Sequence, residues 1–103
     1  MRISSKLLAE IIEIFQNKFT ADDELYLFGS RTDDNKKGGD IDLFLWTTNK
    51  RYDHWLNCKL DILGKLSMVL DEKADLIIGC SDLAMKDSFI AQINKQRQKI
   101  RLL

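Results

Sequence analysis

The chain has 103 residues, of which 45% are hydrophobic and 31% are charged. This length fits a single domain over residues 1–103, and this composition fits a chain that folds around an apolar core rather than a disordered one. The 16 Lys and Arg residues balance the 16 Asp and Glu residues, so the formal net charge is zero. Without a bulk positive charge, binding of nucleic acid is disfavoured.

No stretch of the sequence approaches the ~20 apolar residues that span a bilayer, and no signal-peptide pattern is visible, so we expect no membrane contact. The two cysteines, Cys58 and Cys80, are expected to be reduced thiols in a cytoplasmic protein. Together with the single histidine they are too few for a zinc site. A domain this small buries a limited share of its surface, so we expect a homo- or hetero-oligomer.

The first half of the chain predicts one helix and two strands. Apolar side chains recur every three or four positions over residues 4–19, which indicates an amphipathic helix capped by Ser4 or Ser5. The apolar run over residues 24–28 predicts a buried strand. Residues 40–46 alternate, which predicts a strand with Ile41, Leu43 and Leu45 on one face and Asp40, Asp42 and Phe44 on the other.

The second half predicts a helix over 51–70, a strand over 74–79 and a last helix over 82–98 capped by Ser81. The apolar side chains expected on the inner faces of the two helices are Leu56, Leu60, Leu63, Leu66, Val69, Leu70, Met85, Phe89, Ile90 and Ile93. The order α-β-β-α-β-α predicts an α+β fold. We expect a small mixed or antiparallel sheet of three to four strands with helices packed on one side.

Acidic side chains interrupt two of the predicted strands. Asp40 and Asp42 lie on one strand face with backbones ~6.5 Å apart, where their carboxylates repel unless a hard cation such as Mg²⁺ joins them. That strand alone leaves a solvated face as an equal alternative. Asp75 is a lone acid in the apolar run 74–78. If the two strands are neighbours, the three carboxylates together make a plausible two-metal site.

A Gly-Ser pair stands at the end of the first predicted strand. Gly29 lets the backbone approach a ligand, and the following amides with the Ser30 hydroxyl can donate to phosphate oxygens, with Arg31 beside them. Such a pair is by itself more often a turn. About ten residues join the two strands, and long loops in compact domains often carry function.

The pattern Gly29-Ser30, nine residues, then Asp40-Ile41-Asp42-Leu43 resembles the signature of the DNA polymerase β-like nucleotidyltransferases. The closest resemblance is to the minimal nucleotidyltransferases, short prokaryotic proteins often paired with a HEPN-domain chain. It implies the nucleotidyltransferase fold, with Asp40, Asp42 and Asp75 as catalytic residues and Mg²⁺ ligands. It also implies that Gly29, Ser30 and Arg31 bind the phosphates of a nucleoside triphosphate.

The implied reaction moves a nucleoside monophosphate, by default AMP from ATP, to a hydroxyl acceptor and releases pyrophosphate. The acceptor would be a HEPN-type partner protein, so the chain would be antitoxin-like. Many relatives read Gly-Ser-Arg-x-Arg-Gly, whereas Asp33 and Asp34 follow Arg31-Thr32 here. This departure keeps open a non-catalytic antitoxin that binds a partner chain. A third reading, nucleic-acid binding by the basic segment 95–101, is disfavoured by the zero net charge.

Overall fold

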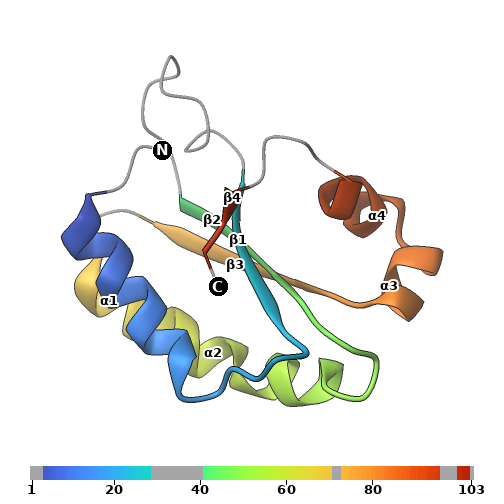
Figure 1. The fold of residues 1–103 in the computed structure, drawn as a ribbon, viewed down its shortest axis with the longest axis horizontal. Helices are drawn as coiled ribbons and strands as arrows, with labels where there is room; N and C mark the ends of the chain where they lie inside the picture. Colours follow the sequence, from blue (N-terminus) through green and yellow to red (C-terminus); the bar gives the residue numbers. More distant parts are fainter. Residues whose placement is uncertain (1–3, 29–40, 71–72, 96–99, 103) are drawn as a thin grey trace.

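A computed structural model describes residues 4–28, 41–70, 73–95 and 100–102 of the chain (Figure 1). Within these residues a sheet of four strands has the order β3-β2-β1-β4. The strands are β1 (Glu24–Phe28), β2 (Ile41–Trp46), β3 (Ala74–Gly79) and β4 (Ile100–Arg101). β1 pairs antiparallel with β2 and β4, whereas β2 and β3 run parallel. This mixed sheet confirms the predicted α+β fold class.

The described helices are α1 (Ser5–Gln16), α2 (Tyr52–Val69), α3 (Ser81–Lys86) and α4 (Ser88–Lys95). The helix predicted over 82–98 is therefore two shorter helices. The break lies at Asp87, whose backbone is extended and whose carboxylate accepts the backbone N–H of Phe89 at 2.9 Å, so it caps the start of α4. None of the helices in the described ranges is both long and apolar enough to cross a membrane.

The main core lies between α1, α2 and one face of the sheet, as the alternation in residues 40–46 predicts. Its fully buried members include Ile41, Leu43, Leu45, Leu25, Leu27, Leu76, Ile11, Phe15, Trp55, Ile62 and Leu66. Figure 1 shows α1 and α2 on this side and α3 and α4 on the other. The expectation of helices on one side thus holds for α1 and α2, and α4 adds a partial second layer.

The second layer is a smaller cluster in which Ile90 and Ile93 of α4 pack against Phe28 and Phe44 of the sheet. Gly79, at the end of β3, makes this contact close. A Cβ atom at that position would lie 2.9 Å from Ile90 Cγ2 and 3.0 Å from the Phe44 ring. The glycine therefore lets α4 settle directly on the aromatic face of β2.

The buried faces of the helices differ from the prediction at several positions. In α2, Leu56, Leu60 and Val69 are exposed, whereas Trp55 is fully buried together with Ile62 and Leu66. The apolar residues of α2 lie around most of the helix, so their spacing did not define one inner face. In the last segment Met85 of α3 and Phe89 of α4 are also exposed, whereas Ile90 and Ile93 of α4 are buried as predicted.

A buried carboxylate fixes the end of the sheet that is remote from the predicted acidic site. Asp23 is 1% exposed, and its two oxygens accept hydrogen bonds from Arg51 Nη2 at 3.0 Å and Nε at 3.1 Å. Thr47 Oγ1 donates at 2.6 Å, Trp55 Nε1 at 3.1 Å and the Thr20 backbone N–H at 2.9 Å. These bonds tie the segment before β1 to the end of β2 and the start of α2.

The network changes the acidity of Asp23. Burial raises the pKa of this carboxyl, but the hydrogen bonds from Arg51 and from the surrounding hydroxyl, amide and indole groups outweigh burial. Together they lower the pKa of Asp23 from 3.8 to about 2. A folded-state pKa this far below the unfolded value corresponds to about 2 kcal/mol of stability at neutral pH.

We predict that Asp23→Asn lowers the free energy of unfolding by about 3 kcal/mol, because the amide NH₂ would face the N–H donors of Arg51 or Trp55 and leave the guanidinium unpaired. Denaturant titration followed by circular dichroism measures the change. Asp22→Asn is the matched control, since Asp22 is an exposed neighbour. Equal stability of the two variants would contradict a structural role for the Asp23 network.

The same network predicts an acid-dependent stability. Since the pKa of Asp23 is lower in the folded chain, its contribution is fully present above about pH 4 and is lost as the pH falls towards about 2. Unfolding curves recorded between these pH values should show a steeper loss for the parent chain than for Asp23→Asn. Parallel curves for the two proteins would show that another carboxylate governs acid unfolding.

Candidate functional site

Three paired residues form a row across the sheet, and two of them are the predicted acids. Phe28 of β1 pairs with Asp42 of β2, and Asp42 pairs with Asp75 of β3. Because β2 and β3 are parallel and in register here, the Cα atoms of Asp42 and Asp75 lie roughly 4.8 Å apart. The row stands at the edge where β2 and β3 begin and β1 ends (Figure 1).

Both acidic side chains project from the same face of the sheet. Their strand neighbours Leu43 and Leu76 are buried in the core beneath α1 and α2, so Asp42 and Asp75 point to the opposite face. Asp42 is half-buried and Asp75 is exposed. Asp75 Oδ1 accepts the backbone N–H of Leu76 at 2.9 Å. Two carboxylates therefore stand abreast on one surface, which is the arrangement that a shared cation requires.

Aromatic side chains border this acidic pair on the same face. Phe28 lies next to Asp42 in the register, and its ring packs edge-on against Phe44 with centroids 6.4 Å apart. Phe44 also lies 6.0 Å from Trp46. This apolar border lies on the side of Asp42, whereas Asp75 remains exposed to solvent. The strand alternation placed Phe44 on this face, but the position of Phe28 follows only from the strand register.

The remaining predicted site residues, Gly29, Ser30, Arg31 and Asp40, lie outside the described residues. In the described ranges no group of three or more His, Cys, Asp or Glu side chains is placed to hold a metal ion. The structure thus brings together Asp42 and Asp75, which are two of the three predicted carboxylates. Two acids from different strands offer hard oxygen ligands of the type that Mg²⁺ prefers.

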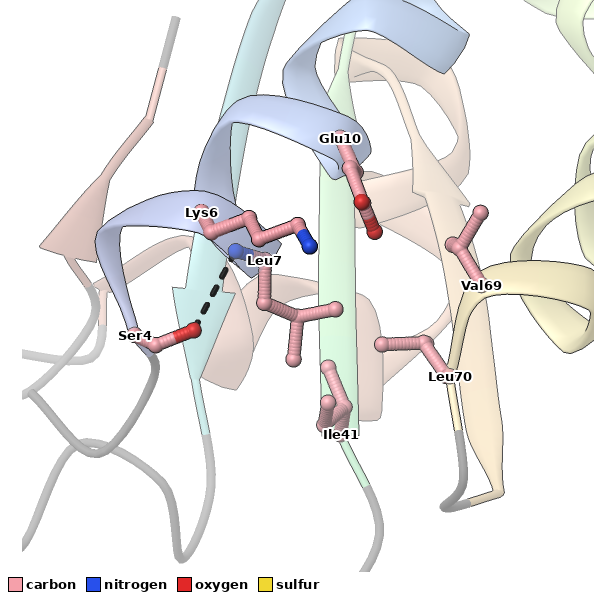
Figure 2. A pocket seen from close by; sticks show the side chains of 7 residues that line it. All are labelled: Ser4, Lys6, Leu7, Glu10, Ile41, Val69 and Leu70. Atoms are coloured by element: carbon pink, nitrogen blue, oxygen red, sulfur yellow. Dashed lines mark hydrogen bonds between the residues drawn. The ribbon is translucent and has the colours of Figure 1, made fainter.

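A pocket of about 340 Å³ lies on the other face of the sheet and is separate from the acidic pair (Figure 2). Leu7 of α1, Ile41 of β2 and Leu70 form its apolar floor, and Lys6 and Glu10 extend over it. Ile41 points into this pocket, so the next strand residue, Asp42, points away from it. The pocket therefore contributes no side chain to the acidic site.

The chain matches a known family over nearly its whole length. The sequence profile of the family described as "Polymerase beta, Nucleotidyltransferase" matches residues 9–101. A search of curated protein sequences gives no significant match. The match spans both acidic strands and the helix between them.

Solved structures share the fold at low sequence identity. A toxin–antitoxin structure with AMP-PNP is 20% identical, covers 93% of this chain and 72% of that chain, and has a TM-score of 0.63. A second toxin–antitoxin structure, MntA-HpeT, is 19% identical with a TM-score of 0.59, over 93% of this chain and 71% of that one. It is a mutant in which two aspartates two positions apart are replaced by glutamate. A protein of Sulfolobus solfataricus assigned as a nucleotidyltransferase is 21% identical with a TM-score of 0.52, over 93% of this chain and 76% of that one.

The geometry of the acidic pair predicts that Asp75→Asn stabilises the chain in the absence of divalent cations. The change removes one of two like charges on paired strand residues, and the amide oxygen can still accept the Leu76 N–H, so we expect a gain of about 0.5 kcal/mol. Denaturant titration in EDTA measures it, with Asp22→Asn as the control. A loss of stability would show that the two carboxylates do not repel each other in the folded chain.

Proposed function

Because the chain belongs to the polymerase beta nucleotidyltransferase family, we propose that it transfers a nucleoside monophosphate from a nucleoside triphosphate to a hydroxyl group, with Mg²⁺ as cofactor. The observation that carries this proposal is the register that sets Asp42 beside Asp75 on one face of two parallel strands. Nothing in the core calls for adjacent acids, whereas this chemistry needs a pair of closely spaced carboxylates.

The metal ligands would be Asp42 and Asp75, joined by Asp40. Asp40 precedes Ile41 in the chain and is two positions from Asp42, so strand alternation would direct all three carboxylates to one face. Mg²⁺ held by these residues would offset their negative charge and would supply electrostatic stabilisation to the oxygens of an in-line displacement. Oxygen ligands from two strands are compatible with a two-metal site.

The phosphate contacts would come from the segment that follows β1. Gly29, Ser30 and Arg31 follow Phe28 directly, and Phe28 is paired with Asp42, so the chain leaves β1 beside the acidic pair. Backbone amides and the Ser30 hydroxyl would hold the β- and γ-phosphates, as in other Gly-containing phosphate loops. We assign ATP as the donor, and therefore AMP as the transferred group.

The reaction is an in-line attack of the acceptor hydroxyl on the α-phosphorus. Asp75 is the more exposed acid, so it is the one we assign to take the hydroxyl proton as the new P–O bond forms. The bond between the α-phosphorus and the β-phosphate oxygen breaks, and pyrophosphate leaves with that electron pair.

The acceptor would belong to a second protein chain. Two of the similar structures are toxin–antitoxin assemblies, one with AMP-PNP and one altered at two aspartates with the spacing of Asp40 and Asp42. These likenesses support an antitoxin-like role in which the chain modifies a hydroxyl of a HEPN-domain partner. A nucleic-acid acceptor is disfavoured by the zero net charge.

We predict that Asp42→Asn and Asp75→Asn each reduce transfer of label from α-labelled ATP to the partner by about 100-fold or more, because each replaces a charged carboxylate ligand with a neutral amide. Asp22→Asn should transfer at the parental rate, and EDTA should abolish transfer in all variants. Mg²⁺ or Mn²⁺ should raise the unfolding temperature of the parent chain and not that of Asp75→Asn. This second measurement tests the metal site without an acceptor.

The same experiment separates transfer from simple binding. Transfer by Asp42→Asn at the parental rate would contradict the proposed site. A parent chain that binds its partner in Mg²⁺ and ATP without transferring label would instead identify a non-catalytic antitoxin. The acids Asp33 and Asp34 in the loop after Arg31 favour that second function, since they oppose the charge of a triphosphate.

A further inference from the structure

The outer side of α2 carries a continuous row of apolar and small residues. Leu56, Leu60, Gly64 and Met68 recur every four positions, so they form one ridge along the helix. Leu60 is 83% exposed and Met68 is 85% exposed, although both are large apolar side chains. Scattered exposed apolar residues are ordinary, but a continuous ridge of them marks an interaction surface.

Gly64, in the middle of this ridge, is not required by the fold of the chain itself. A Cβ atom added there would meet nothing within 4 Å. Glycine in a helix interior is nonetheless about 1 kcal/mol less favourable than alanine. The buried residues Ile62 and Leu66 stand two positions to either side, so Gly64 faces directly away from the sheet. A glycine at this place allows the backbone of another helix to approach closely.

The ridge is symmetric about Gly64. Leu60 stands one turn before the glycine and Met68 one turn after it, so a reversed copy of the ridge has the same pattern of large, small and large residues. One flank carries Asp61 and Lys65, which form an exposed i,i+4 ion pair of 3.2 Å. In a reversed copy the acid and the base exchange places, so the two flanks are complementary in charge.

We propose that two copies of the chain associate through α2, antiparallel and related by a two-fold axis, with Gly64 at the crossing point. Leu60 then packs on Met68 of the second copy, and Asp61 lies opposite Lys65 of the second copy. Ridges formed by residues four apart interlock at a crossing angle of about 50°. The contact is isologous, so one surface serves both copies and the assembly closes at a dimer.

This dimer leaves the acidic edge of each copy open. α2 packs on the sheet face that carries Leu43 and Leu76, whereas Asp42 and Asp75 project from the other face. The association is therefore compatible with access to the acidic pair in both copies and does not depend on any activity of that pair.

Sedimentation velocity across a concentration series up to about 1 mM tests the proposal, with a reversible monomer–dimer equilibrium as the expected result. Gly64→Ala should raise the dissociation constant about tenfold or more, because its methyl group stands at the crossing point. The same variant should raise the unfolding temperature of the dilute monomer, since alanine favours the helix. Gln16→Ala, at an exposed position of α1, should leave the dissociation constant unchanged.

A charge exchange tests the orientation of the two helices. Asp61→Lys and Lys65→Asp should each weaken the dimer, and the double variant should restore it, because an antiparallel pair needs opposite charges at these two positions. A chain that remains monomeric at every concentration overturns the proposal. A dimer whose dissociation constant Gly64→Ala leaves unchanged also overturns it. The same holds if the ridge binds only a different protein and not a second copy.

Discussion

Two carboxylates that lie side by side on neighbouring strands repel each other. In this chain the packing of the sheet holds them together despite that repulsion. Asp42 and Asp75 are set side by side by the parallel register of β2 and β3, which is fixed from beneath by the buried residues Leu43 and Leu76. The rings of Phe28 and Phe44 pack against each other on the same face, beside Asp42. A cation bound between Asp42 and Asp75 would offset this repulsion, and the proposed function depends on such a cation.

At the other end of β2, a buried carboxylate has its charge balanced by hydrogen-bond donors. Asp23 is more deeply buried than Asp42, yet its charge is matched by Arg51 and by hydrogen bonds from Thr20, Thr47 and Trp55. Thr47 directly follows β2, so its hydrogen bond to Asp23 anchors that end of the strand, whereas Asp42 lies near the other end beside Asp75. The stability contributed by the Asp23 network can offset the cost of placing two like charges side by side at the other end of β2.

Local patterns in the sequence were enough to predict β1, β2 and β3, as in the alternation of Ile41, Asp42 and Leu43 between two faces, whereas the two-residue strand β4 was not predicted. The pairing of Asp42 with Asp75 needed one assumption, that the two strands are neighbours, and the sheet order confirms it. The inner face of α2 could not be predicted, since apolar residues surround that helix and only tertiary packing selects Trp55. The Asp23 network was missed because Thr47, Arg51 and Trp55 are distant in the chain.

The parallel pairing of β2 with β3 has a consequence for how the acidic edge comes into being. Parallel neighbours cannot be joined by a tight turn, so the whole of α2 must cross the sheet before Asp75 can reach Asp42. During synthesis Asp42 leaves the ribosome well before Asp75, and the two acids come together only when the crossover is packed. Under the proposed function, a divalent cation would therefore bind only to a chain whose crossover has already packed, and an incompletely folded chain would lack the site.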